Sequence, residues 1–168
     1  LGVTLAGDFL TLFLFWEIMA FSSVFLVWYR KIPSSVDSGF RYLLWHVIGG
    51  LILFSGIMIQ YSVSGDLSIQ YLPFHGWWPT DIQSLATFLI LIGFIVNAAV
   101  PPFGAWLPDA YPAATVTGAV FMSAFTTKTA VYALIRVCAG SEILIFLGVA
   151  MAIYGVVYAV LENDARRL

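Results

Sequence analysis

The sequence has 168 residues, of which 61% are hydrophobic and 10% are charged, and its mean hydropathy is +0.96. Soluble domains contain roughly 45 to 50% apolar residues, so this composition excludes an ordinary soluble domain and indicates an integral membrane protein. The formal net charge of -2 gives no reason to expect a nucleic-acid partner, and the single cysteine, Cys138, leaves no intrachain disulfide to propose.

Five windows of the chain are long and apolar enough to cross a bilayer, because a spanning helix needs about 20 mainly apolar residues. These windows exceed ordinary strand length by about two- or threefold, and open strands cannot span lipid. An all-α membrane bundle is therefore predicted, with no separate soluble domain. The five spans are expected at about 7–29, 40–62, 82–110, 113–136 and 142–162.

Each of the first two predicted spans contains one conspicuous ionisable residue. Glu17 is the only charge between Phe9 and Tyr29, and an ionised group at mid-bilayer costs roughly 2.5 to 3.5 kcal/mol on insertion scales. His46 lies in the second span, and its unperturbed pKa of about 6.5 suits proton exchange near neutrality. Both are candidate functional residues, although a histidine near a helix end is often only a hydrogen-bonded packing residue.

The third predicted span is discontinuous. The segment from Asn97 to Gly118 holds four of the seven prolines. Pro101 and Pro102 lack backbone donors and bias Val100 away from helix, so the break is expected at Pro101-Pro102. Freed backbone groups at membrane depth are tolerated where they face protein or a water-filled cavity, which favours an ion path; an ordinary proline kink is the alternative.

The fourth predicted span carries Lys128 near its middle. Counted along the helices from the outer face, Glu17 lies roughly 15 Å deep and Lys128 roughly 12 Å, while His46 and Asn97 lie roughly 20 Å deep. These four residues predict a proton path from the cytoplasmic side to the midplane. The alternative is that Glu17 and Lys128 pair only to lock two helices together. Candidate hydrogen-bonding neighbours of Lys128 are Tyr132, Thr126, Thr127 and Thr129, most of which are expected only to solvate the helix.

Basic residues predict the orientation, because Lys and Arg in short loops stay cytoplasmic. With the N-terminal end outside and the C-terminal end cytoplasmic, Arg136 is the only basic residue that falls on the outer face. The loop at 64–81 then lies outside, has no Lys or Arg, and places Trp77 and Trp78 in an aromatic belt. The cytoplasmic residues in this topology are Arg30, Lys31, Arg41, Arg166 and Arg167.

Three stretches resemble one family: GDFLTLFLFWEIM at 7–19, VPPFGAWLPDAYPAATVTGAV at 100–120 and TTKTAVYALIRV at 126–137. They are similar to the fifth, seventh and eighth helices of the antiporter-like subunits shared by respiratory complex I and Mrp-type Na+/H+ antiporters. PPFGAWLPDAYP resembles the family's Pro-Leu-His-x-Trp-Leu-Pro-Asp-Ala signature. Because members are much longer, the resemblance implies a central fragment of an inverted-repeat bundle.

The resemblance implies roles for individual residues. Glu17 matches the family's helix-five glutamate, and Lys128 matches its helix-eight lysine, the central proton carrier. Asn97 stands where the family usually has a helix-seven lysine, and an amide carries no proton at neutral pH. Either Lys128 or a group outside the chain then partners Glu17, or the subunit conducts differently, with His46 as a substitute relay. VNAA at 96–99 resembles the D-like branch of the Mrp antiporter subunits.

The favoured function is an ion-translocating subunit in a prokaryotic plasma membrane, moving protons in exchange for Na+ or coupled to a redox complex such as NADH-quinone oxidoreductase. The alternative is a structural subunit whose proton path is inactive because of Asn97. A carrier of organic solutes is disfavoured, since such sites gather several polar groups at the midplane. The expected partners are other membrane subunits, the bilayer, protons and Na+; neither cofactor nor metal is expected, and the chain by itself is not expected to be an enzyme.

Overall fold

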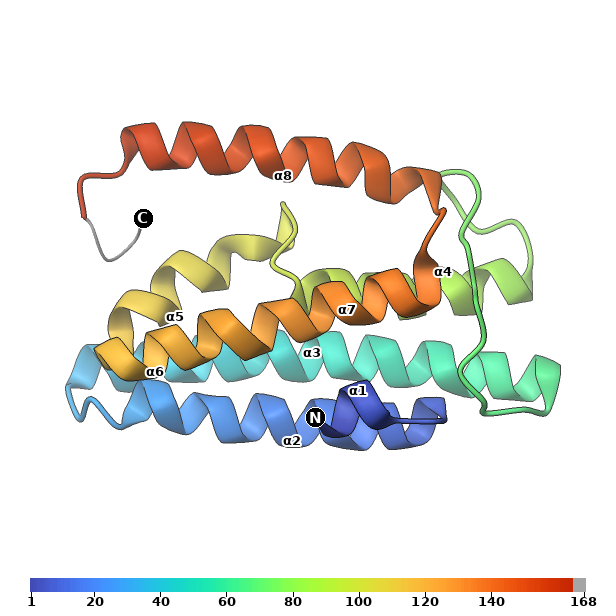
Figure 1. The fold of residues 1–168 in the computed structure, drawn as a ribbon, viewed down its shortest axis with the longest axis horizontal. Helices are drawn as coiled ribbons and strands as arrows, with labels where there is room; N and C mark the ends of the chain where they lie inside the picture. Colours follow the sequence, from blue (N-terminus) through green and yellow to red (C-terminus); the bar gives the residue numbers. More distant parts are fainter. Residues whose placement is uncertain (165–168) are drawn as a thin grey trace.

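The computed structural model describes residues 1–164, and this part of the chain is helical without strands (Figure 1). The all-α prediction is confirmed; Arg166 and Arg167 lie outside the described residues. In chain order the elements are α1 (Gly2–Leu5), α2 (Phe9–Trp28), α3 (Pro33–Ser64), α4 (Ile82–Asn97), a 3-10 turn (Phe103–Trp106), α5 (Leu107–Ala113), α6 (Val116–Phe121), a π-helical turn (Met122–Thr126), α7 (Thr127–Cys138) and α8 (Glu142–Leu161).

Within residues 1–164, four helices are long and apolar enough to cross a membrane. Three of them are α2, α3 and α8, and the fourth is the continuous helix Val116–Cys138, formed by α6, the π-helical turn and α7. The apolar helix α4 has 16 residues and is shorter. The third predicted span, 82–110, is therefore not one helix but α4 followed by a separate short helical region.

The helix ends follow from local chemistry. The carboxylate of Asp8 caps α2 by accepting hydrogen bonds from the Thr11 backbone N–H and hydroxyl, each at 2.7 Å. Pro33 occupies the first turn of α3, where its missing donor is not needed. Gly65 ends α3 in the left-handed conformation, with φ of 69°. Because Pro33 starts it, α3 is longer than the predicted span 40–62.

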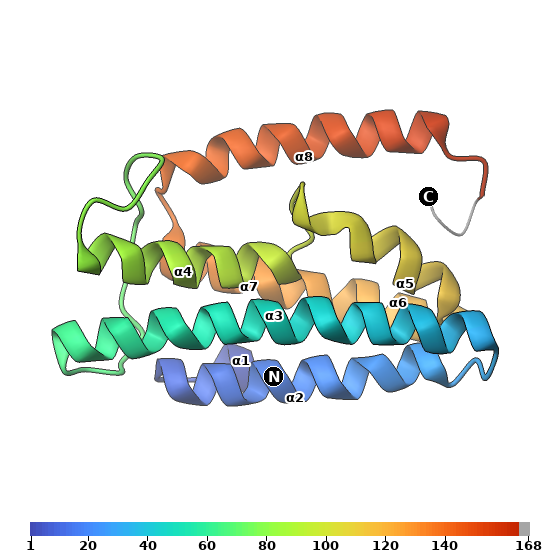
Figure 2. The ribbon, with the colours of Figure 1, turned by 180° about the vertical axis from the view of Figure 1, so that it is seen from behind.

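Helix α3 is the centre of the bundle. It packs between α2 and α4 and also contacts α5 (Figure 2). Glycines bring the α3 and α4 backbones close, because a Cβ built at Gly56 would lie 2.8 Å from the Ile90 backbone nitrogen and one at Gly93 would lie 2.6 Å from Leu53 Cβ. Small residues at such contacts are typical of helix pairs in membranes.

Helix α8 differs from the others because none of its residues is buried. Figure 1 shows it running along the bundle beyond α7 and beyond the non-helical segment between α4 and α5. Large apolar side chains such as Ile145, Phe146 and Val160 are exposed on it. Helix α8 therefore borders the bundle without closing over it.

Candidate functional site

The break after α4 is a Schellman motif. Ala99 adopts the left-handed conformation, with φ of 57°, and donates to Val96 O at 3.2 Å, while Val100 N donates to Ile95 O at 3.2 Å. These two bonds satisfy carbonyls at the helix end, although alanine pays roughly 1 to 2 kcal/mol for this conformation. Helix α4 therefore ends at Asn97.

Pro101 and Pro102 lie in the turn that follows the motif. The helix ends at the Schellman motif before it reaches the prolines, and the non-helical segment 98–102 that follows contains both of them, where the sequence predicts the break. Gly104 allows the chain to fold back, since a Cβ there would clash with the Ala99 carbonyl. Figure 2 shows α4 and α5 following one another along α3, with the non-helical segment between them.

Glu17 lies near the middle of α2, and its side chain reaches α3. A Cβ built at Gly50 would overlap Glu17 Oε1, so the carboxylate lies directly against the α3 backbone. Glu17 Oε1 is buried and has no hydrogen-bond partner among the described residues. The residue as a whole is half-buried, so its carboxylate is held inside the bundle by α3 rather than by a cation.

Asn97 contacts α3 at Gly49, the residue that precedes Gly50. Its side chain is fully buried, and neither Oδ1 nor Nδ2 makes a hydrogen bond within residues 1–164. Asn97 Oδ1 lies 3.4 Å from a Cβ built at Gly49. Glu17 from α2 and Asn97 from α4 therefore meet the consecutive glycines Gly49 and Gly50, which brings together two of the residues predicted from the sequence.

His46 lies one turn before this glycine pair on α3 and is fully buried. Its Nδ1 is 2.9 Å from the carbonyl oxygen of Tyr42. Because a carbonyl only accepts, Nδ1 donates, and the neutral ring presents Nε2 as an acceptor. Nε2 has no partner in the described part of the chain. We call Glu17, His46, Gly49, Gly50 and Asn97 the α3 junction.

Aromatic and hydroxyl side chains surround His46. Its ring lies 4.0 Å from the Tyr42 ring and 4.6 Å from that of Trp106, between centroids. The Tyr42 hydroxyl is 2.6 Å from Ser23 Oγ, and Thr126 also interacts with it. This surround was missed from the sequence, although Tyr42 precedes His46 by one helical turn.

Six buried side-chain atoms lack a hydrogen-bond partner among residues 1–164. Leaving a buried polar group unpaired costs roughly 1 to 3 kcal/mol, and four of the six atoms belong to residues of the α3 junction. One of these atoms belongs to Tyr111 on α5, whose hydroxyl lies near Thr127 without forming a standard hydrogen bond. The six atoms are Trp16 Nε1, Glu17 Oε1, His46 Nε2, Asn97 Oδ1, Asn97 Nδ2 and Tyr111 Oη.

Lys128 lies outside the α3 junction. It is exposed and lines a cavity of about 430 Å³ between the break, α7 and α8, which we call the Lys128 cavity. Pro101, Tyr154 and Tyr158 also line this cavity. The only ion pair within the described range joins Arg41 to Asp109, so Glu17 and Lys128 do not lock α2 to α7.

The π-helical turn Met122–Thr126 immediately precedes α7. A π turn adds a residue to the helix and is frequent at functional sites. It leaves Thr126 and Thr127 buried, while Lys128 is exposed. Tyr132, a candidate neighbour of Lys128, donates to the Thr4 carbonyl at 3.1 Å.

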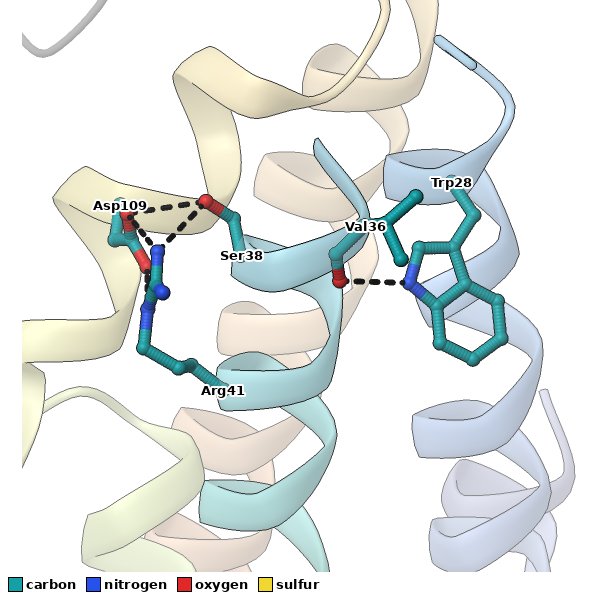
Figure 3. Close-up of polar contacts among 5 residues, drawn as sticks. All are labelled: Trp28, Val36, Ser38, Arg41 and Asp109. Atoms are coloured by element: carbon teal, nitrogen blue, oxygen red, sulfur yellow. Dashed lines mark hydrogen bonds and ion pairs between the residues drawn. The ribbon is translucent and has the colours of Figure 1, made fainter. Parts of the chain in front are cut away.

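A polar clamp joins α5 to α3 at one end of the bundle (Figure 3). Arg41 Nε donates to Asp109 Oδ2 at 2.7 Å, and Arg41 Nη2 donates to Oδ1 at 3.1 Å. Ser38 Oγ also donates to Asp109 Oδ1, at 3.1 Å. Nearby, Arg30 Nη1 donates to the Pro112 carbonyl at 2.5 Å. The clamp holds the helical region after the break against α3.

Comparison with known protein families identifies the chain's relatives. The family described as "NADH:quinone oxidoreductase/Mrp antiporter, TM" matches residues 6–168. The chain belongs to this family. A relative from Staphylococcus aureus (strain JH9), named Na(+)/H(+) antiporter subunit A1, is 36% identical over 142 residues, which cover 81% of this chain and 17% of the relative. The resemblance in the sequence is thereby confirmed at the level of the family.

Solved structures of this kind share the fold. A chain of the Mrp complex from Dietzia sp. DQ12-45-1b superimposes with a TM-score of 0.86 at 27% identity, covering 99% of this chain and 33% of that one. A chain of the archaeal membrane-bound sulfane sulfur reductase gives 0.81 at 29% identity, covering 99% and 36%. A chain of respiratory complex I from Thermus thermophilus gives 0.81 at 25% identity, covering 97% and 37%.

These three relatives are chains of an archaeal respiratory membrane complex, an Mrp complex and respiratory complex I. The chain spans 17% of the staphylococcal relative's length and about a third of the structural relatives' chains. The match to a relative named A1 does not distinguish the branches of Mrp subunits. The assignment to the D-like branch therefore stays a prediction.

Proposed function

We propose that this chain is part of an ion-translocating subunit that moves protons across a prokaryotic plasma membrane, within a complex of several membrane subunits. The observation that carries the proposal is the α3 junction. There, a carboxylate, an imidazole and an amide are buried together with unpartnered polar atoms. Intramembrane ionisable groups usually mark ion or proton pathways, and apolar side chains would fill the same space at lower cost.

The roles within the junction follow from proton chemistry. Glu17 and His46 take up and release protons, because a carboxyl and an imidazole each have two accessible protonation states. Asn97 remains neutral and orients hydrogen bonds between them through its amide donor and acceptor. Lys128 takes up and releases protons in the Lys128 cavity, on the other side of the break. The region from α4 to α5, 82–110, is proposed to act as one discontinuous membrane span.

The exchanged ion is proposed from the name of the relative. That protein is called a Na(+)/H(+) antiporter subunit, so we infer Na+ as the counter-ion, whereas coupling to a redox complex is the inference that the complex I relative supports. Reconstitution of the complete complex in vesicles separates these two. Antiport predicts that a Na+ gradient alone drives a pH gradient; redox coupling predicts that it does not.

A structural subunit without transport is the second candidate. It is favoured by Asn97, which cannot carry a proton, and by the absence of an ion pair between Glu17 and Lys128 within residues 1–164. Proton flux through vesicles that contain the unaltered complex decides between the two functions. Measurable flux that disappears when the subunit carries Glu17→Gln excludes the structural function. No flux in the unaltered complex, with flux gained by Asn97→Lys, supports it.

The orientation is proposed from the basic residues at one end of the bundle. Arg30, Lys31 and Arg41 lie at the α2–α3 end, where the clamp to α5 also lies. Positive charges in short connections favour the cytoplasmic side. The N-terminal end is then outside. Cysteine labelling from either side of oriented vesicles tests this, with Lys31→Cys expected to react from the cytoplasmic side.

A further inference from the structure

We propose that Gly50 is a positioning residue for Glu17: its missing side chain is the space in which the Glu17 carboxylate sits, and this space orients the carboxylate toward Asn97 and His46. The inference rests on the proposed function, because it concerns how the junction holds its proton carrier. It assigns a role to a residue that carries no charge and no polar side chain.

The contact is specific to the carboxylate. A Cβ at Gly50 would overlap Glu17 Oε1 and lie 2.9 Å from Glu17 Cδ, and both atoms belong to the acid group rather than to its stem. Any side chain at position 50 therefore displaces the carboxylate itself. An oxygen held against an α-carbon also gains a weak C–H···O contact, which adds a small preference for this position.

The position of Gly50 on α3 explains why displacement matters. A Cβ at Gly49, the preceding residue, would meet the Val96 side chain at 3.0 Å and Asn97 Oδ1 at 3.4 Å. His46 lies one helical turn away on the same helix. Residues three and four apart share a helix face, so His46, Gly49 and Gly50 form one surface. A carboxylate pushed off Gly50 leaves this surface and loses its approach to the unpartnered atoms of Asn97 and His46.

Other glycines of the described chain have different surroundings. At Gly56 an added Cβ meets the backbone of Ile90 and Ala86, and at Gly93 it meets Leu53, so both are packing glycines. At Gly148 nothing lies within 4 Å. Among residues 1–164, Gly50 alone has an acidic side chain in the space of its missing Cβ.

The test is a rescue experiment on the complete complex in vesicles. Gly50→Ala is expected to lower proton flux about tenfold to hundredfold, since small misplacements of reacting groups cost this much. Adding Glu17→Asp shortens the acid by one methylene and makes room for the new methyl group. The double variant is expected to transport at least about threefold faster than Gly50→Ala alone, a positive coupling between contacting residues.

Gly56→Ala is the matched control, because it lies on the same helix and crowds α4 instead of an acid. Glu17→Asp is expected to give it no rescue, and Gly148→Ala is expected to transport normally. The inference is overturned if Gly50→Ala transports at the unaltered rate, or if Glu17→Asp fails to rescue it, or if Gly56→Ala is rescued equally. Failure of the proposed function looks different, because then Glu17→Gln leaves the flux unchanged.

Discussion

The α3 junction and the Lys128 cavity hold the ionisable residues of the membrane region in opposite settings. In the α3 junction, His46 and Asn97 are fully buried and the Glu17 carboxylate lies against the helix backbone. In the Lys128 cavity, the lysine is exposed and lies opposite α8, a helix without buried residues. The acid side of the proposed path is therefore pre-organised by close packing, whereas its basic side is open.

This difference predicts which kind of substitution affects each of the two sites. A tightly packed site depends on the shape of its neighbours, so small changes of volume matter there. An open site depends mainly on charge and on access to water. Substitutions that change only volume are therefore expected to act at the α3 junction, and substitutions that change charge are expected to act at both places.

The largest expected effect on the open side comes from Lys128→Ala. Removing the amine takes away the proposed proton carrier of the Lys128 cavity, and proton flux in vesicles is expected to fall about 100-fold, within the range known for acid–base groups. Lys128→Arg keeps the charge, but arginine does not release a proton in proteins. The proton flux of this variant is therefore expected to fall as far as that of Lys128→Ala. Normal flux in Lys128→Arg would mean that the residue supplies only charge.

A smaller loss is expected from His46→Gln. Glutamine keeps a donor and an acceptor but takes up no proton near neutral pH, so flux is expected to fall about tenfold. Tyr42→Phe is the matched control, because it removes a neighbouring hydroxyl and keeps the ring against His46. If both variants lose flux equally, the site depends on hydrogen bonding rather than on the imidazole proton.

The clamp between α3 and α5 is expected to contribute little stability. The side chain of Arg41 is 55% exposed and that of Asp109 is 34% exposed, and exposed ion pairs contribute about 0.2 to 1 kcal/mol. Arg41→Ala is therefore expected to lower the unfolding temperature of the purified complex slightly, and less so at high salt. A large loss of proton flux with unchanged stability would instead place the clamp in the transport path.

The smallest effect is expected at the N-cap of α2. The backbone N–H of Thr11 donates to Asp8 and lowers the pKa of that carboxyl below its ordinary value. Asp8 then stabilises the fold above the unfolded pKa, and this contribution is lost as the pH falls through the lowered value. Asp8→Asn keeps the cap without the charge, so thermal stability measured from pH 7 down to pH 3 should vary less than in the unaltered protein.

Much of the fold followed from simple patterns. Apolar windows predicted α2, α3 and α8, because lipid requires long apolar helices. Prolines predicted a break at Pro101-Pro102, and both residues lie in the non-helical segment that follows α4. Helix α4 ends before it reaches the prolines, because Ala99 adopts a left-handed conformation that alanine seldom takes. The local sequence gives no signal for that conformation.

The arrangement of the site was harder to predict. Equal depth suggested that Glu17 and Lys128 communicate, but depth does not reveal the direction in which a side chain points. The π-helical turn at Met122–Thr126 inserts one residue and rotates the following face by about 100°, and sequence periodicity does not reveal it. The role of Gly50 was equally hidden, because it depends on which helix packs against α3.

Proton flux through the complete complex with Glu17→Gln tests the central claim most directly. Glutamine preserves the shape of the side chain against Gly50 and cannot release a proton. Flux is expected to fall at least about 100-fold, while Glu142→Gln, at the exposed start of α8, transports normally. Unchanged flux in Glu17→Gln would contradict a proton path through the α3 junction.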